Sequence, residues 1–208
     1  SEPFDLALES GQELLGARLA YETWGELNAD KSNAILVLHA LTGDSHLIGD
    51  AGNGHATAGW WNGLVGEGKP LDTGDYFVIT PNVLGGCQGS TGPSSLDRNG
   101  REYGPSFPQI TIRDQAEAFL RLADQLGIKT FFAIIGGSMA GMHALEIAIE
   151  HPERLDRLAI LAAPPYSTAD QIALNTVQLE AIRSDSNFEA GWYYDAKPGF
   201  GPHKGLAL

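Results

Sequence analysis

The segment over residues 131–150 is the feature of this sequence that most constrains the fold. The run FFAII, residues 131–135, predicts a short buried strand, and Met139–Glu150 predicts a helix that Pro152 ends. Only Gly136, Gly137 and Ser138 separate the two. A strand that turns directly into a helix is typical of folds in which helices pack against a sheet.

The rest of the chain repeats this alternation of apolar strands and amphipathic helices. Further strands are predicted at residues 14–21, 34–41, 76–84 and 155–163, the second of them buried on both faces. Helices are predicted at 111–126 and 168–184; Thr111 and Asp114 form a capping box for the first, and Gly127 ends it. This order predicts an α/β fold with a mainly parallel sheet and flanking helices.

Composition excludes several classes of partner. The chain has 13 basic and 26 acidic residues and a net charge of −13, which argues against a nucleic-acid partner. Its one cysteine, Cys87, rules out an internal disulfide and fits a reducing compartment. There is no apolar run long enough for a membrane span and no export signal at the N-terminus. We therefore expect a soluble cytoplasmic protein without a membrane partner.

Ser138 is the candidate nucleophile. It stands at the sharp point of the strand–turn–helix segment, in a variant of the G-x-S-x-G pattern with Gly136 and Ala140 at the two small positions. Small residues are needed there because the turn brings strand and helix backbones close together. The Met139 amide lies at the helix N-terminus, where it can donate to an oxyanion. The loop after an earlier strand, in HALTGDSH, supplies the Leu41 amide as a second donor.

The other reactive side chains are weaker candidates. In this arrangement the catalytic histidine follows the serine and an acid, so His39 is interpreted as a residue that braces its loop. His143 is expected to point away from Ser138, and His151 to lie at the helix end. His203 has the right order but follows no strand, and Cys87 has no neighbouring base. No metal site is predicted, because no ligands cluster along the sequence.

Five segments together resemble the homoserine O-acetyltransferase family of the α/β-hydrolase superfamily. They are YETWGELNADKSNAILVLHALTGDSH (21–46), PNVLGGCQGSTGPSS (81–95), FPQITIRDQ (107–115), IIGGSMAGMHALE (134–146) and AIRSDSNFEAGWYY (181–194). The resemblance implies the α/β-hydrolase fold. The chain is similar only to the N-terminal part of such an enzyme, and the C-terminal strands of the family are missing from it. We therefore expect an incomplete core over residues 1–165 and the start of a helical lid over 166–208.

The same resemblance assigns roles to four positions. Ser138 matches the nucleophile, Leu41 and Met139 match the backbone oxyanion donors, and Thr42 matches a residue that lines the amino-acid pocket. The sequence departs from the family at Ala140, where glycine is usual, and at His143, where glutamine is usual. The acid and histidine of the family's triad, and its carboxylate-binding arginine, are expected outside this chain.

The resemblance implies transfer of an acetyl group from acetyl-CoA to L-homoserine through an acyl-serine, in methionine biosynthesis. Acetyl-CoA is then a co-substrate, no cofactor is permanently bound, and the full-length enzyme is expected to be a homodimer. Three alternatives stay open. They are a succinyl-CoA-dependent or serine-accepting relative, an esterase or thioesterase, and a non-catalytic α/β module.

Overall fold

The computed structural model describes residues 1–52, 54–194 and 201, and it divides the chain into two compact units. The first is formed by Ser1–Thr91 and Gln109–Pro164, and the second by Gly92–Pro108 and Pro165–Leu208. The sequence did not anticipate that residues 92–108 group with the second unit. The assignment of residues 166–208 to the start of a lid stays a prediction.

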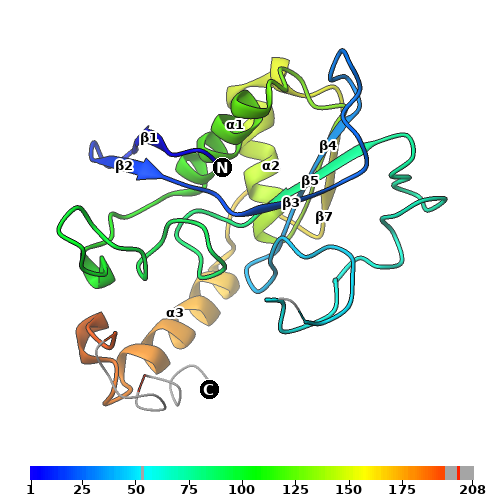
Figure 1. The fold of residues 1–208 in the computed structure, drawn as a ribbon. Coiled ribbons are helices and arrows are strands. Elements are labelled where there is room, and N and C mark those ends of the chain that lie inside the picture. The colour runs from blue at the N-terminus through cyan, green and yellow to red at the C-terminus, as the bar shows by residue number, and fades with distance from the viewer. Residues whose placement is uncertain (53, 195–200, 202–208) are drawn as a thin grey trace. The chain divides into compact units, whose positions relative to one another are not determined.

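A five-stranded sheet forms the centre of the first unit, in the order β3-β5-β4-β6-β7 (Figure 1). The strands β4, β5, β6 and β7 are parallel, and β3 pairs with β5 in the antiparallel sense. The bounds are β3 Tyr21–Trp24, β4 Ala34–Leu38, β5 Phe77–Pro81, β6 Ala133–Gly137 and β7 Leu158–Leu161. All five residues of β4 are buried, which confirms the predicted doubly buried strand.

The single strand predicted over residues 14–21 is wrong. The structure has β2 (Glu13–Ala17), which pairs with β1 (Phe4–Ala7) in a separate antiparallel sheet, and then β3. Between β2 and β3 the backbone amides donate to side chains of a distant loop and not to a neighbouring strand. Arg18 N donates to Thr91 Oγ1 at 2.9 Å, and Ala20 N donates to Ser90 Oγ at 3.0 Å. These contacts with a distant loop interrupt the extended run.

Two helices cover one face of the central sheet (Figure 1). Helix α1 (Ile112–Leu126) begins at the predicted capping box and ends at Gly127, whose φ of 71° is left-handed. Helix α2 (Met139–Glu150) follows β6 directly and packs against both α1 and the sheet. These elements confirm the predicted helices and hold the β6–α2 turn against a rigid support.

The long loop after β4 covers the other face of the sheet. Ile35 and Val37 of β4 form a buried cluster with Leu47, Val65 and Val78, and aromatic and aliphatic side chains of the loop pack against it. A segment without regular structure therefore shields this face of the sheet from water, as the helices shield the opposite face. Burial of these apolar side chains holds the described parts of the loop against the sheet.

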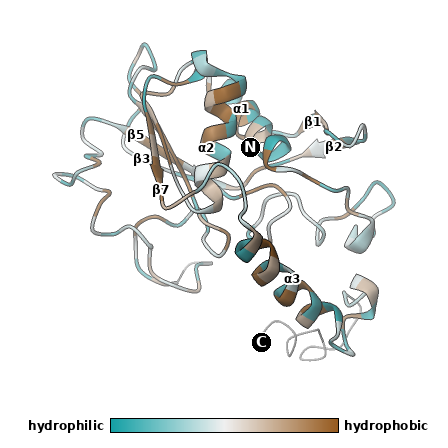
Figure 2. Cartoon of the chain, turned by 180° about the vertical axis from the view of Figure 1, so that it is seen from behind, coloured by the Kyte–Doolittle hydropathy of each residue, from teal (hydrophilic) through white to brown (hydrophobic). Residues whose placement is uncertain are grey.

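The second unit contains helix α3 (Ala169–Arg183), which begins at a capping box formed by Thr168 and Gln171. None of its residues is buried, and hydrophobic and hydrophilic residues are interspersed along it (Figure 2). Two short 3-10 turns, Gly104–Ser106 and Glu189–Gly191, lie in the same unit. Within the described residues, no helix is long and apolar enough to cross a membrane.

Candidate active site

Ser138 occupies the turn between β6 and α2 in a strained conformation. Its φ is 57° and its ψ is −125°, a combination that residues other than glycine rarely adopt. Two hydrogen bonds hold the turn: Ser138 N donates to Leu161 O at 2.9 Å, and Gly141 N donates to Ser138 O at 3.0 Å. Ser138 is exposed. The turn thus holds a hydroxyl in fixed geometry at the carboxyl edge of the sheet.

The glycines around the serine show where the backbones approach each other. A Cβ on Gly136 would lie 2.2 Å from Ala140 O, and a Cβ on Gly141 would lie 2.4 Å from Ala163 Cβ. The position of Ala140 itself has room for its methyl group, which is fully buried. The close approach on the helix side falls at Gly141, one residue later than the sequence pattern implies, and this explains why alanine is tolerated at 140.

The two predicted oxyanion donors follow neighbouring strands. Leu38 of β4 pairs with Gly136 of β6 in parallel register, and each donor, Leu41 or Met139, comes three residues after its strand partner. Both amides therefore lie at the same edge of the sheet. Within the described part of the chain neither amide donates a hydrogen bond. Thr42 is exposed beside Leu41. The catalytic roles of these residues stay predictions.

His39 braces the loop that carries Leu41, as the sequence predicted. Its ring is buried, with Nδ1 donating to Ala40 O at 2.8 Å and Nε2 accepting from Val83 N at 3.2 Å. Burial lowers the pKa of His39, so the neutral form with these two partners is favoured. Both ring nitrogens are occupied by backbone groups, which leaves no nitrogen free to act as a base.

His143 is fully buried and faces α1. Its Nε2 donates to Gln115 Oε1 at 2.6 Å, and its ring stands edge-on to Phe119. Burial, with a smaller contribution from His39, lowers the pKa of His143 to about 4. Its Nδ1 has no partner among the described residues. His143 is therefore a neutral core histidine.

The remaining histidines do not complete a triad in the described residues. His151 ends α2 and pairs with Glu117 and, at 3.9 Å, with Glu153. His203 lies outside the described residues. In the described residues, no hydrogen bond joins the Ser138 hydroxyl to a histidine or a carboxylate. The expectation that the base comes from elsewhere stays a prediction.

Asn82 is a residue of the site region that sequence reasoning missed. It is 5% exposed, and it joins two loops: its Oδ1 accepts from Ser45 N at 2.7 Å and its Nδ2 donates to Gln88 O at 2.7 Å. With Leu41 and His39 it lines a cavity of about 60 Å³, and Cys87 is exposed at the same wall. A polar residue directly after a buried strand was the available signal.

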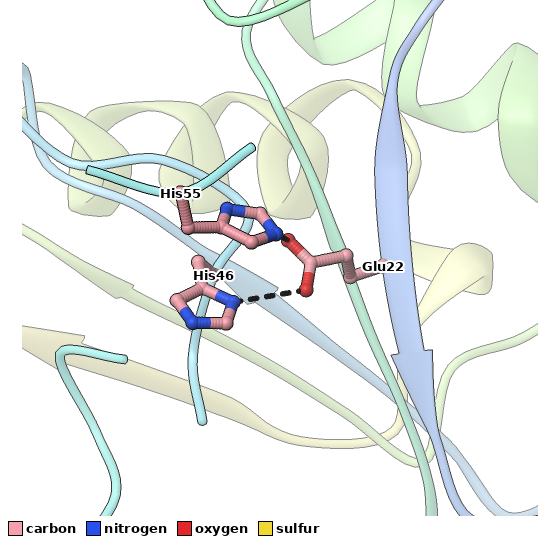
Figure 3. A group of neighbouring side chains, drawn as sticks. All are labelled: Glu22, His46 and His55. Atoms are coloured by element: carbon pink, nitrogen blue, oxygen red, sulfur yellow. Dashed lines mark hydrogen bonds and ion pairs between the residues drawn. The ribbon is translucent and has the colours of Figure 1, made fainter. Parts of the chain in front are cut away.

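Glu22 of β3 forms a second cluster with His46 and His55, which both lie in the long loop after β4 (Figure 3). The prediction of no metal site rested on spacing along the chain, which does not reveal this group. The three side chains have atoms of the kinds that bind metals, all within 4.8 Å of one another. The cluster is considered separately below.

Comparison with known families agrees with this geometry. Residues 33–201 match the model of the alpha/beta hydrolase fold, so the chain belongs to that family. This confirms the fold class expected from the sequence. The strand order and the serine on the β6–α2 turn are the features that define the class here.

Several curated relatives of the chain are homoserine O-acyltransferases. The chain is 60% identical to a homoserine O-acetyltransferase of Leifsonia xyli, over 96% of this chain and 50% of the relative. It is 48% identical to a homoserine O-succinyltransferase of Nitrosomonas eutropha, over 98% of this chain and 54% of the relative. The chain thus spans about half the length of the curated relatives it matches. These similarities confirm the resemblance to homoserine O-acetyltransferases.

Solved structures show the same fold in two kinds of enzyme. The homoserine O-acetyltransferase of Bacillus anthracis is 33% identical, with a TM-score of 0.87 over 99% of this chain and 57% of that one. Esterase E22 in its L374D form is 30% identical, with a TM-score of 0.90 over 100% of this chain and 57% of that one. The fold alone therefore does not choose between acyl transfer and hydrolysis.

Proposed function

We propose that the protein containing this chain transfers the acetyl group of acetyl-CoA to the hydroxyl of L-homoserine, through an acyl-serine at Ser138. The strained turn that presents the Ser138 hydroxyl, with φ of 57°, carries this proposal. The 60% identity to the Leifsonia xyli acetyltransferase supports the choice of acetyl donor and homoserine acceptor.

The reaction has two halves that share one intermediate. Ser138 Oγ attacks the thioester carbonyl, its proton passes to a base, and the CoA sulfur leaves with a proton. The homoserine hydroxyl then attacks the serine ester, loses its proton to the same base, and Ser138 recovers its hydroxyl. In each half the amides of Leu41 and Met139 donate to the oxyanion of the tetrahedral intermediate. Thr42 contacts homoserine, and acetyl-CoA enters as a co-substrate with no bound cofactor.

The histidine and acid of this mechanism are proposed to lie outside the described residues. Helix α3 is proposed to begin a lid that excludes water, because water would hydrolyse the acyl-serine. Its exposed apolar side chains support this role, and they are Ile172, Leu174, Val177 and Leu179. We also propose that the whole protein is a homodimer, which sedimentation of the intact protein tests.

Labelling and substitution of Ser138 test the proposed nucleophile. Mixing the intact protein with acetyl-CoA should add one acetyl group to Ser138, located by peptide mass spectrometry. Ser138→Ala should lower acetyl transfer at least ~10⁴-fold, since no covalent intermediate forms. Cys87→Ser is the control, because Cys87 is the exposed alternative nucleophile, and it should keep both label and activity. Label on Cys87 or on a lysine contradicts the proposal.

Steady-state kinetics test the shared intermediate independently. Varying acetyl-CoA and homoserine should give parallel lines in a double-reciprocal plot, because CoA leaves before homoserine reacts. Intersecting lines would indicate direct transfer in a ternary complex and would remove the acyl-serine from the mechanism.

Hydrolysis is the second candidate function, favoured by the similarity to esterase E22. The two functions differ in the acceptor of the acyl-serine, so competition between water and homoserine separates them. Acyl transfer predicts O-acetylhomoserine as the main product at millimolar homoserine, and hydrolysis predicts acetate. Replacing acetyl-CoA with succinyl-CoA, and homoserine with serine, tests the alternatives within the family.

A further inference from the structure

Glu22, His46 and His55 converge from two parts of the chain. Glu22 comes from β3, and both histidines come from the long loop between β4 and β5 (Figure 3). His46 Nδ1 lies 3.1 Å from Glu22 Oε2, and His55 Nε2 lies 3.7 Å from Glu22 Oε1. The two imidazole rings are stacked, with centroids 3.7 Å apart. Both histidines thus direct a nitrogen at one carboxylate.

The hydrogen-bond partners of His46 suit a metal ligand. Its Nε2 lies 3.3 Å from the backbone carbonyl of Asp50, and its Nδ1 faces the Glu22 carboxylate. A histidine that binds a metal through one ring nitrogen ordinarily donates its other N–H to such a carbonyl. With Nε2–H held by Asp50, Nδ1 is the atom of His46 that can bind an ion together with Glu22.

Buried polar groups also hold the carboxylate of Glu22 in place. Ser45 Oγ donates to Glu22 Oε1 at 2.7 Å, and Asn82 Nδ2 donates to Ser45 Oγ at 3.2 Å. Ser45 and Asn82 are only 4% and 5% exposed. The side chains of His46 and Glu22 are 8% and 27% exposed. Buried groups that orient a ligand in this way are typical of metal sites.

The ligand atoms of the three residues all lie within 4.8 Å of one another. Bond lengths of about 2.0–2.2 Å at a tetrahedral angle place two ligand atoms about 3.3–3.5 Å apart. His46 Nδ1 lies 3.1 Å from one Glu22 oxygen and His55 Nε2 lies 3.7 Å from the other, so binding of one ion requires a small movement of these side chains. The His55 side chain is 29% exposed, so it has room to tilt out of the stack and direct Nε2 at the ion.

We propose that Glu22, His46 Nδ1 and His55 Nε2 bind a divalent ion of the Zn²⁺ class. Two imidazoles and one carboxylate suit Zn²⁺ and its neighbours, whereas Mg²⁺ and Ca²⁺ prefer sites made only of oxygen. Three protein ligands leave a fourth position for water. His55 also lines a cavity of about 280 Å³, from which water can reach the ion. The ion would tie β3 to the segment that carries Leu41.

Metal binding to the intact protein tests this proposal directly. After treatment with EDTA and removal of the chelator, calorimetric titration with Zn²⁺ should show one ion bound per chain. Substituting Co²⁺ should give visible d–d absorption of a low-coordinate site. His46→Ala, His55→Gln and Glu22→Gln should each weaken binding at least about 100-fold, and Ser45→Ala about 10–100-fold. Zn²⁺ at 100 times the wild-type Kd should raise the Tm of the wild type by about 5 °C or more, and should leave the Tm of the variants at Glu22, His46 and His55 nearly unchanged.

Two control variants keep the test specific. His151→Ala removes a histidine from another His–Glu pair, and Cys87→Ser removes a soft ligand from the wall of the same cavity. Both should bind Zn²⁺ as the wild type does. Circular dichroism without metal shows whether each variant is folded, and His55→Gln, at the most exposed ligand, keeps the test valid if His46→Ala does not fold. Absence of stoichiometric binding, or wild-type binding by His55→Gln and Glu22→Gln, overturns the proposal.

Discussion

At the scale of single residues, the site region contains buried polar side chains that form hydrogen bonds with a few fixed partners. His39 and His143 both lie in the core, and burial lowers the pKa of each. Asn82 fixes the loops on either side of the Leu41 cavity through three hydrogen bonds. Because these groups are shielded from water, their protonation and hydrogen bonding contribute directly to the stability of the site.

His143→Gln should make the protein less sensitive to acid. The pKa of His143 is about 4 in the folded chain and near 6.5 when unfolded, so the unfolded chain binds the extra proton between these values. The free energy of unfolding is then fully retained above pH 6.5 and falls as the pH drops toward 4. From pH 7 to 4.5 the wild type should lose about 2–3 kcal/mol more than the variant.

Urea unfolding of both proteins at the two pH values measures this difference. Glutamine at this position can still donate to Gln115 Oε1, which the wild-type ring contacts at 2.6 Å, so the variant is expected to fold. Equal losses of stability in the two proteins would show that His143 is not the group that takes up the proton.

At the scale of elements, the β6–α2 turn depends on one glycine of an adjacent pair. A Cβ on Gly136 would lie 2.2 Å from Ala140 O, which is backbone and cannot move without displacing α2. A Cβ on Gly137 would meet Leu161 O at 3.6 Å, an ordinary contact. The sequence pattern alone does not distinguish these two positions, since both fit a small-residue turn.

Gly136→Ala should destabilise the protein by about 3 kcal/mol or more, because the new methyl group overlaps the first turn of α2. Gly137→Ala should change stability by no more than about 1 kcal/mol, and it is the matched control. Thermal and chemical unfolding of both variants measure the effect. Similar stabilities for the two variants would mean that the turn relaxes around the extra carbon.

At the scale of the whole molecule, the described residues hold a candidate nucleophile, Ser138, and candidate oxyanion donors, and no described histidine is hydrogen-bonded to Ser138. Ser138 is exposed on its turn, while the rings of His39 and His143 are held by other groups. A serine hydroxyl without a base is a weak nucleophile at neutral pH. The proposed reaction therefore requires groups beyond those that the structure brings together.

The 208-residue chain expressed by itself should show no substantial acetyl transfer. Thiol release from acetyl-CoA, measured with homoserine present, should stay far below the ~10 per second of a typical enzyme. A rate within about tenfold of that value would contradict this expectation. His203→Ala would then show whether His203, which lies outside the described residues, supplies the base.

The sequence by itself determined the α/β class, the doubly buried β4, both helices around the sheet and the serine turn. Each of these features follows from the hydrophobic periodicity or the turn-forming residues of one contiguous segment. Tertiary structure decided the rest: the break between β2 and β3, the close approach at Gly141, and the meeting of Glu22, His46 and His55. Such features arise from contacts between segments far apart in the chain, and a contact of that kind leaves no periodic signal in either segment.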